Sequence, residues 1–160
     1  MASGDDRAAA PDGLDGTGLR IGLVKARWNA EIVDRLEAGV DRGLLHLGVP
    51  ASDIVVESVP GSFEVPMGAR ILATSGEVDA IVTIGCVIRG ETTHYELVSE
   101  GAASGVQRVQ LDTGVPIAFG LVTVETRDQA LARSDGPGGH NVGESAAAVA
   151  VEMARMARRH

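Results

Sequence analysis

The chain has 160 residues, an apolar fraction of 44% and a formal net charge of −8, with Lys25 as its only lysine. This length fits one domain with a sizeable core, and the acidic balance argues against a nucleic-acid surface. No apolar run approaches the length of a membrane span or a signal-peptide core. We therefore expect a cytoplasmic protein without membrane contact.

Aromatic residues make up only 2% of the chain, so the core has to be built from aliphatic side chains. Such residues suit helices packed tightly on a parallel sheet. The single cysteine, Cys86, lies in an apolar run, without a second cysteine for a disulfide or a CxxC spacing for a metal. We expect Cys86 to be a small buried residue.

Residues 1–18 are small, polar and rich in Gly and Asp, and are expected to form a flexible arm that could add a strand to a neighbouring subunit. Residues 19–160 form the domain, in which apolar runs and helical periodicities alternate. Strands are expected at 19–26, 53–59, 80–88 and 116–124. Helices are expected at 31–47, 67–75, 93–105, 127–133 and 144–159. Residues 107–112 either end the third helix or form a short extended segment.

This order predicts an α/β fold, a three-layer α/β/α sandwich around a four-stranded, mainly parallel sheet of the flavodoxin-like kind. No GxGxxG opens the first helix, which disfavours a dinucleotide-binding Rossmann domain. The pattern GxxxxGK[ST] is also absent, which disfavours nucleotide hydrolysis.

Polar and aromatic residues follow the predicted strands. Ligands of open α/β sheets bind outside the carboxyl ends of the strands, and Trp28 at such a position either stacks on a planar ring or packs in the core. Asn29 is placed to cap the following helix. Glu64 either complements a helix dipole or accepts hydrogen bonds from a polyhydroxy ligand.

The third strand ends in Arg89-Gly90 and is followed at once by Glu91, Thr92, Thr93 and His94. His94 is the natural proton carrier here, because its ordinary pKa lies near neutrality. The alternative is that the polar residues of this turn only cap the next helix. The residues of the turn alone do not decide between the two.

Five segments taken together resemble the lumazine synthases. They are R-W-N, G-S-F-E-V-P, G-C-V-I-R-G-E-T-T-H-Y-E, F-G-L-V-T-V-E-T and D-Q-A-L-A-R, in the family's order and spacing, and the resemblance runs from about Leu19 to the end. It implies a transferase that condenses 5-amino-6-(D-ribitylamino)uracil with 3,4-dihydroxy-2-butanone 4-phosphate. The product is 6,7-dimethyl-8-ribityllumazine, formed with release of phosphate and water in the penultimate step of riboflavin biosynthesis, with no metal and no cofactor.

The resemblance also assigns roles to residues. Trp28 is expected to stack on the pyrimidine ring and His94 to transfer protons. Glu91 and Thr92 lie in the turn whose backbone holds the phosphate, and Arg133, expected from the next subunit, matches the arginine that grips it. The further residues expected to bind the ribitylaminouracil are Asn29, Ser62, Phe63, Glu64, Cys86, Val87, Ile88 and Phe119, the last from an adjacent subunit.

A homo-oligomer built from pentamers is implied, with the site at the subunit interface and riboflavin synthase as a further partner. One position departs from the family, which commonly has a lysine where Val142 stands before the last helix. The preceding loop is slightly longer than in the shortest family members, which favours pentamers or decamers over sixty-subunit shells. The missing lysine leaves room for two alternatives, a lumazine- or flavin-binding homologue without turnover and a shell-forming structural protein.

Overall fold

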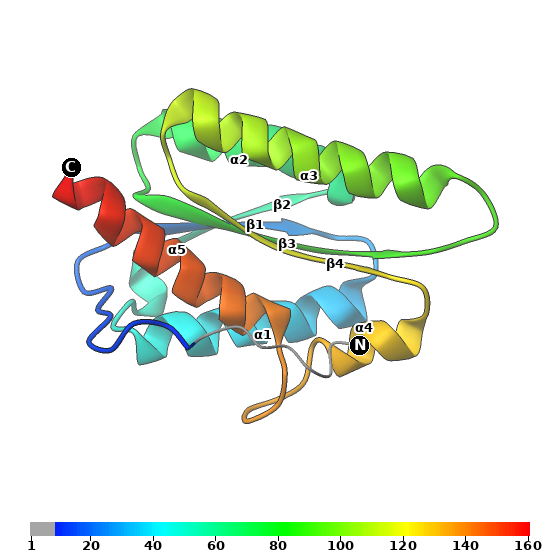
Figure 1. The fold of residues 1–160 in the computed structure, drawn as a ribbon, viewed down its shortest axis with the longest axis horizontal. Coiled ribbons are helices and arrows are strands. Elements are labelled where there is room, and N and C mark those ends of the chain that lie inside the picture. The colour runs from blue at the N-terminus through cyan, green and yellow to red at the C-terminus, as the bar shows by residue number, and fades with distance from the viewer. Residues whose placement is uncertain (1–8) are drawn as a thin grey trace.

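The computed structural model describes residues 9–160 and contains one parallel sheet between two layers of helices (Figure 1). Its strands, in the spatial order β2-β1-β3-β4, are β1 (Ile21–Ala26), β2 (Ile54–Val59), β3 (Ala80–Ile88) and β4 (Ile117–Val124). The helices are α1 (Ala30–His46), α2 (Val65–Ser75), α3 (His94–Thr113), α4 (Arg127–Ala132) and α5 (Val142–Arg159). Two short 3-10 helices are η1 (Ala51–Asp53) and η2 (Ser62–Glu64). The predicted flavodoxin-like α/β fold is confirmed.

The two helical layers bury separate apolar clusters on the two faces of the sheet. Helices α1 and α5 cover Leu23 and Val82, whereas α2 and α3 cover Val24 and Ile81. Strand β3 is buried along both faces except at Ile88. Its burial explains why this segment reads as a continuous apolar run rather than an alternating one.

The ends of several helices differ from the sequence prediction. Residues 107–112 belong to α3, which ends only where Gly114 adopts a left-handed conformation with φ of 73°. Helix α5 begins at Val142, because the side chain of Asn141 accepts a hydrogen bond from the Glu144 N–H and caps the helix. Helix α2 begins at Val65, directly after η2.

The described part of the N-terminal segment lies against α1 and α5. The Arg155 guanidinium donates to the carbonyl oxygens of Asp15 at 2.6 Å and Thr17 at 2.7 Å. The Gly16 N–H donates to the Leu47 carbonyl at 2.6 Å. Residues 1–8 lie outside the described residues, so the flexible arm over 1–18 and its strand addition to a neighbour stay predictions.

The strand order places the carboxyl ends of β1 and β3 side by side at the centre of the sheet. The chain passes from β1 outward to β2 and then returns to the other side of β1 as β3, so the connections diverge between β1 and β3. Such a switch point leaves a crevice at the carboxyl edge of an open sheet. No helix in residues 9–160 is long and apolar enough to cross a membrane.

Candidate functional site

A cavity of about 470 Å³ opens at the carboxyl edge of the sheet. It is lined by Trp28, Asn29, Ser62, Phe63, Glu64, Cys86, Val87, Ile88, His94, Leu97 and Val98. All of these except Leu97 and Val98 are residues that the sequence predicts for the site. The fold therefore brings together the turns after β1, β2 and β3.

Trp28 stands at the mouth of this cavity and is 64% exposed, so it is not a core residue. Its indole lies against Gly61, where an added Cβ atom would collide with ring atoms Cε3 and Cζ3. Glycine at position 61 therefore makes room for the indole. An exposed aromatic ring beside a cavity is suited to stacking on a planar ligand.

Asn29 is the residue before α1, but its side chain does not cap the helix, contrary to the sequence prediction. It adopts a left-handed conformation with φ of 61°, the only non-glycine residue in residues 9–160 with a positive φ. Its side-chain amide donates to the Cys86 carbonyl at 2.8 Å. Asparagine tolerates this backbone conformation better than most residues, and here it joins the turn after β1 to the end of β3.

Glu64 stabilises the turn that precedes α2. Its carboxylate accepts a hydrogen bond from the Gly61 N–H at 3.0 Å. Ser62 is buried, and its hydroxyl approaches β3 so closely that a Cβ atom at Gly85 would lie 2.6 Å from it. The ring of Phe63 packs on Gly101 of α3. These contacts fix one wall of the cavity.

Cys86 is buried, as the sequence predicts. Burial raises the pKa of its thiol to about 11, and the nearby Arg127 guanidinium opposes this shift. The thiol is therefore protonated at neutral pH. A protonated thiol is a poor nucleophile, because the reactive form is the thiolate. At the cavity Cys86 contributes shape and backbone polar groups.

The turn between β3 and α3 presents unpaired backbone donors. Among the described residues, the N–H groups of Gly90, Glu91, Thr92 and Thr93 have no hydrogen-bond acceptor. The only side-chain capping contact in this turn is a long one, from the His94 N–H to the Thr92 hydroxyl at 3.3 Å. Consecutive free N–H groups at the start of a helix form an anion-binding arrangement.

Two comparisons with known proteins agree with this geometry. The family model for 6,7-dimethyl-8-ribityllumazine synthase matches residues 18–158. The 6,7-dimethyl-8-ribityllumazine synthase of Nitrosospira multiformis is 45% identical over 145 residues, which cover 91% of this chain and 88% of that protein. The chain belongs to the 6,7-dimethyl-8-ribityllumazine synthase family. The resemblance drawn from the sequence is confirmed, and the chain is an enzyme of this family.

Not every residue expected for a lumazine synthase site lines the cavity of its own chain. Phe119 lies on the edge strand β4 and is 41% exposed. Arg133 follows α4, and its guanidinium donates to the Gln129 carbonyl at 3.0 Å. Neither residue is among those that line the cavity. Glu91 and Thr92 are exposed in the turn beside His94.

Leu97 and Val98 also line the cavity, and the sequence prediction missed them. The helical periodicity places Val98 on the core face of α3, yet both side chains line the cavity. Leu97 is also largely exposed. The signal lies in their position one turn after His94, since residues three or four apart share a helix face.

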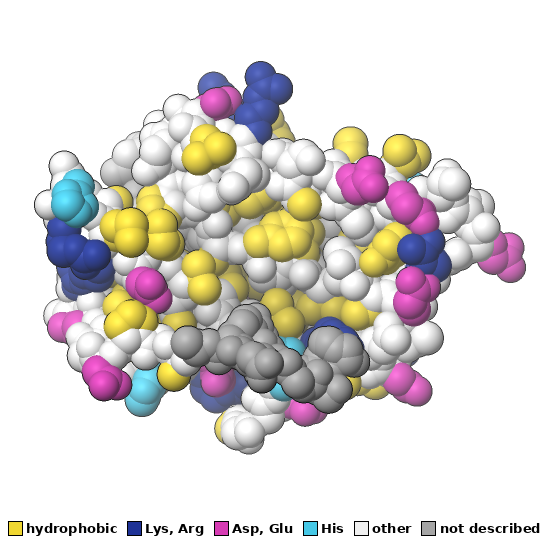
Figure 2. Space-filling view, in the orientation of Figure 1, with side chains coloured by type: hydrophobic (Ala, Val, Ile, Leu, Met, Phe, Trp, Pro, Cys, Tyr) yellow, Lys and Arg dark blue, Asp and Glu magenta, His cyan; other side chains and the backbone are white. Residues whose placement is uncertain are grey.

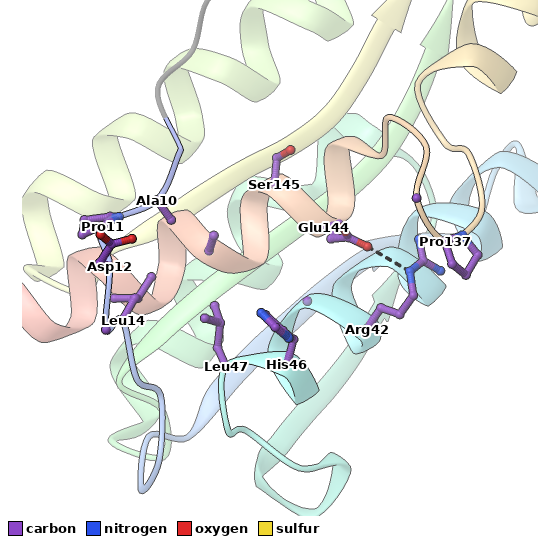
Figure 3. A pocket seen from close by; sticks show the side chains of 14 residues that line it. Ala10, Pro11, Asp12, Leu14, Arg42, His46, Leu47, Pro137, Glu144 and Ser145 are labelled. Carbon is purple, nitrogen blue, oxygen red and sulfur yellow. Dashed lines mark hydrogen bonds and ion pairs between the residues drawn. The ribbon is translucent and has the colours of Figure 1, made fainter.

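A larger cavity of about 750 Å³ lies away from the predicted lumazine synthase site, between the N-terminal segment, α1 and α5 (Figure 3). Its lining includes Arg42 and Glu144, which pair at 2.9 Å. None of the predicted site residues lines it. Across residues 9–160, no group of three His, Cys, Asp or Glu side chains is arranged to hold a metal.

Proposed function

We propose that this chain condenses 5-amino-6-(D-ribitylamino)uracil with 3,4-dihydroxy-2-butanone 4-phosphate, giving 6,7-dimethyl-8-ribityllumazine, phosphate and water. Family membership supports this step of riboflavin biosynthesis. The observation that carries the site is the cavity between Trp28 and His94, with the unpaired N–H groups of residues 90–93 beside it. The two features suit a planar substrate and an anionic one.

The uracil substrate occupies the cavity, with its pyrimidine ring on Trp28. The exposed indole and its support by Gly61 favour this placement. Cys86, Val87 and Ile88 form the facing wall at the end of β3. Ser62, Phe63, Glu64 and Asn29 complete the pocket, and the first three hold the ribityl chain.

The phosphate of the second substrate binds at the turn formed by Glu91 and Thr92. Its oxygens accept hydrogen bonds from the free N–H groups of the turn, and the N-terminal end of α3 adds a favourable dipole. Arg133 of a neighbouring subunit supplies the opposing charge, because Arg133 of the same chain does not line the cavity. Charge-assisted hydrogen bonds of this kind stabilise the departing phosphate.

His94 transfers protons during amine addition, phosphate elimination and ring closure. It is exposed at the cavity, and its ring nitrogens have no hydrogen-bond partner among the described residues. Such a side chain is free to exchange protons with substrate atoms. Holding both substrates in contact supplies much of the remaining acceleration.

The assembly we propose is a homopentamer or a pair of pentamers. Figure 2 shows apolar side chains gathered on the face that carries β4 and α5, and the exposed apolar residues of these elements include Phe119, Val149 and Met153. Contiguous exposed apolar surface favours association. Phe119 of one subunit then reaches the cavity of the next. Riboflavin synthase as a partner and a cytoplasmic location stay predictions.

Val142, which stands where the family commonly has a lysine, lies next to Arg133. The Val142 N–H donates to the Arg133 carbonyl at 2.9 Å, so the two residues are neighbours across the loop. A lysine at 142 would add a second cation near Arg133, and valine cannot. We expect a weaker contribution of this loop to phosphate binding, with turnover retained.

A mixed-substrate assay tests the activity. The purified oligomer is supplied with both substrates, and lumazine is followed by absorbance with inorganic phosphate measured in parallel. Equal amounts of lumazine and phosphate are expected. Binding of both substrates without either product would support a homologue that has lost turnover, or a structural shell protein.

A further inference from the structure

Arg89 is the first residue after β3 and lies in the chain between Ile88, which lines the cavity, and the turn of residues 90–93. Its N–H donates to the Val124 carbonyl at 2.8 Å, which extends the pairing of β3 with β4 by one residue. The backbone is therefore held by the sheet immediately before the turn begins.

The Arg89 side chain joins the turn to two other elements. Its Nε lies 2.7 Å from a carboxylate oxygen of Glu125, just past the end of β4, and its Nη1 pairs with Glu96 in the first turn of α3. Its Cζ lies 4.3 Å from the centroid of the Tyr95 ring. We name Arg89, Tyr95, Glu96 and Glu125 the Arg89 clamp. A planar guanidinium can make all these contacts at once, whereas a lysine ammonium cannot.

The turn itself has few other restraints among the described residues. Its backbone N–H groups are unpaired, and the contact from the His94 N–H to Thr92 is long at 3.3 Å. A Cβ atom at Gly90 would meet no atom within 4 Å, so no side chain packs there. A cradle of backbone donors binds an anion well only when its geometry is fixed in advance.

We propose that Arg89 is a positioning residue, which fixes the 90–93 turn and the first turn of α3 in the arrangement that phosphate and His94 require. This inference rests on the proposed function of the turn. Arg89 acts through Glu96 and Glu125 rather than as a phosphate ligand, since its guanidinium already pairs with both carboxylates.

Glu96 depends on this arginine. One of its carboxylate oxygens pairs with Arg89, while the other is shielded from solvent and has no partner within the described residues. Loss of Arg89 would leave both carboxylate oxygens of Glu96 without a partner among the described residues, and the half-exposed side chain would be free to reorient. That movement would displace the first turn of α3, which carries His94 two residues earlier.

The first test is steady-state kinetics of Arg89→Gln and Arg89→Lys. Both are expected to raise the KM for the butanone phosphate by about tenfold or more, with the KM for the uracil substrate changed by less than about twofold. The matched control is Arg158→Gln, which removes an exposed arginine paired with Asp79 at 2.8 Å at the amino end of β3. Full rescue by Arg89→Lys would overturn the clamp, because lysine keeps only the charge.

The second test uses the sign of a charge effect. Glu96→Gln and Glu125→Gln each remove a negative charge near the phosphate site, so electrostatics alone would lower the KM for the anionic substrate. The clamp predicts the opposite, a rise in this KM in both variants. A fall or no change, beside a rise in Arg89→Gln, would identify Arg89 as a direct phosphate ligand. Glu125 is exposed, so its variant remains informative even where Arg89 variants fail to fold.

Inorganic phosphate separates failure of the clamp from failure of the proposed function. It is expected to compete with the butanone phosphate in the wild type and to compete less well in Arg89→Gln. A wild type that makes no lumazine and binds no phosphate would refute the proposed function itself. An active, phosphate-sensitive wild type with unaffected Arg89 variants would refute the clamp alone.

Discussion

The side-chain amide of Asn29 donates a hydrogen bond to the backbone carbonyl of Cys86 across 2.8 Å. This bond crosses from the turn after β1 to the end of β3, the two central strands of the sheet. It fixes the residue next to Trp28 against the wall formed by Cys86, Val87 and Ile88. The site is therefore held together at the switch point by one polar side chain on a left-handed backbone.

Two substitutions of Asn29 distinguish the contribution of its hydrogen bond to stability from that of its left-handed backbone conformation. Asn29→Gly loses only the bond, worth about 1 kcal/mol. Asn29→Ala loses the same bond and keeps a Cβ atom at positive φ, without the local hydrogen bonding that lets asparagine tolerate this conformation, whereas glycine adopts it without strain. Urea unfolding should rank the alanine variant as the less stable, and both should raise the KM for the uracil substrate. A glycine variant less stable than the alanine variant would contradict the role of the left-handed conformation.

Gly61→Ala should displace the Trp28 indole, because the new Cβ atom would occupy the space of its ring carbons. Trp28 is the only tryptophan, so its fluorescence reports the change directly. We expect a shifted emission spectrum and a raised KM for the uracil substrate. Gly136→Ala is the control, since a Cβ atom there meets nothing within 4 Å. An unchanged spectrum in Gly61→Ala would show that the indole does not depend on this glycine.

Much of the fold follows from sequence periodicity. The apolar run that became β3 and the alternation of strands with helices specify a parallel sheet, and its carboxyl edge then collects Trp28, Ser62 and His94. The side-chain geometry of the site does not follow in this way. Asparagine is a preferred residue type at a helix N-cap. Only the three-dimensional structure shows that the Asn29 side chain donates to the Cys86 carbonyl of β3 instead.

Long-range pairing sets the other limit. Arg89 lies within the sequence segment that carries the family resemblance, yet Glu125 is distant in the chain and meets it only because β3 and β4 are adjacent. Leu97 and Val98 are marked in the sequence only by their spacing from His94, because core packing and cavity lining use the same residue types. Interfaces with neighbouring subunits are the hardest feature to predict from the sequence. An exposed apolar residue such as Phe119 indicates that a partner is expected, but not where that partner lies.

The thiol of Cys86 should resist alkylation in the folded protein. Burial raises its pKa to about 11 from the ordinary 9.0, so its thiolate fraction near pH 8 is about 100-fold lower than usual. Iodoacetamide labelling followed by mass spectrometry should be slow in buffer and fast in urea, with a rate that keeps rising above pH 9. A plateau near pH 9 would contradict the raised pKa.

The contribution of Glu96 to stability should disappear in acid. The hydrogen bond from Arg89 lowers the pKa of this carboxyl below its ordinary value of 4.5. A lowered pKa stabilises the folded state above pH 4.5, and the gain is lost as the pH falls through the folded-state pKa. The Tm of the wild type should exceed that of Glu96→Gln at pH 7, and the gap should narrow below pH 4.5. Glu100→Gln, at an exposed position on the same helix, is the control that removes the same charge without touching Arg89.

Mixed oligomers test whether one active site draws on two subunits. Arg133→Ala should mainly raise the KM for the butanone phosphate, whereas His94→Ala should mainly lower kcat, and each homo-oligomer should be weakly active under dilute substrate. If His94 and Arg133 of one site come from different chains, co-assembly of the two variants restores intact sites at some interfaces. In a ring with head-to-tail contacts and random mixing, about a quarter of the sites carry both native residues.

The expected result is therefore about a quarter of wild-type activity from an equal mixture, measured after co-refolding or co-expression. Mixing the folded homo-oligomers without subunit exchange is the control and should give no recovery. If both residues served the same site from one chain, every site in the mixture would lack one of them, and no activity would return. Arg133 does not line the cavity that contains His94, and that separation favours recovery.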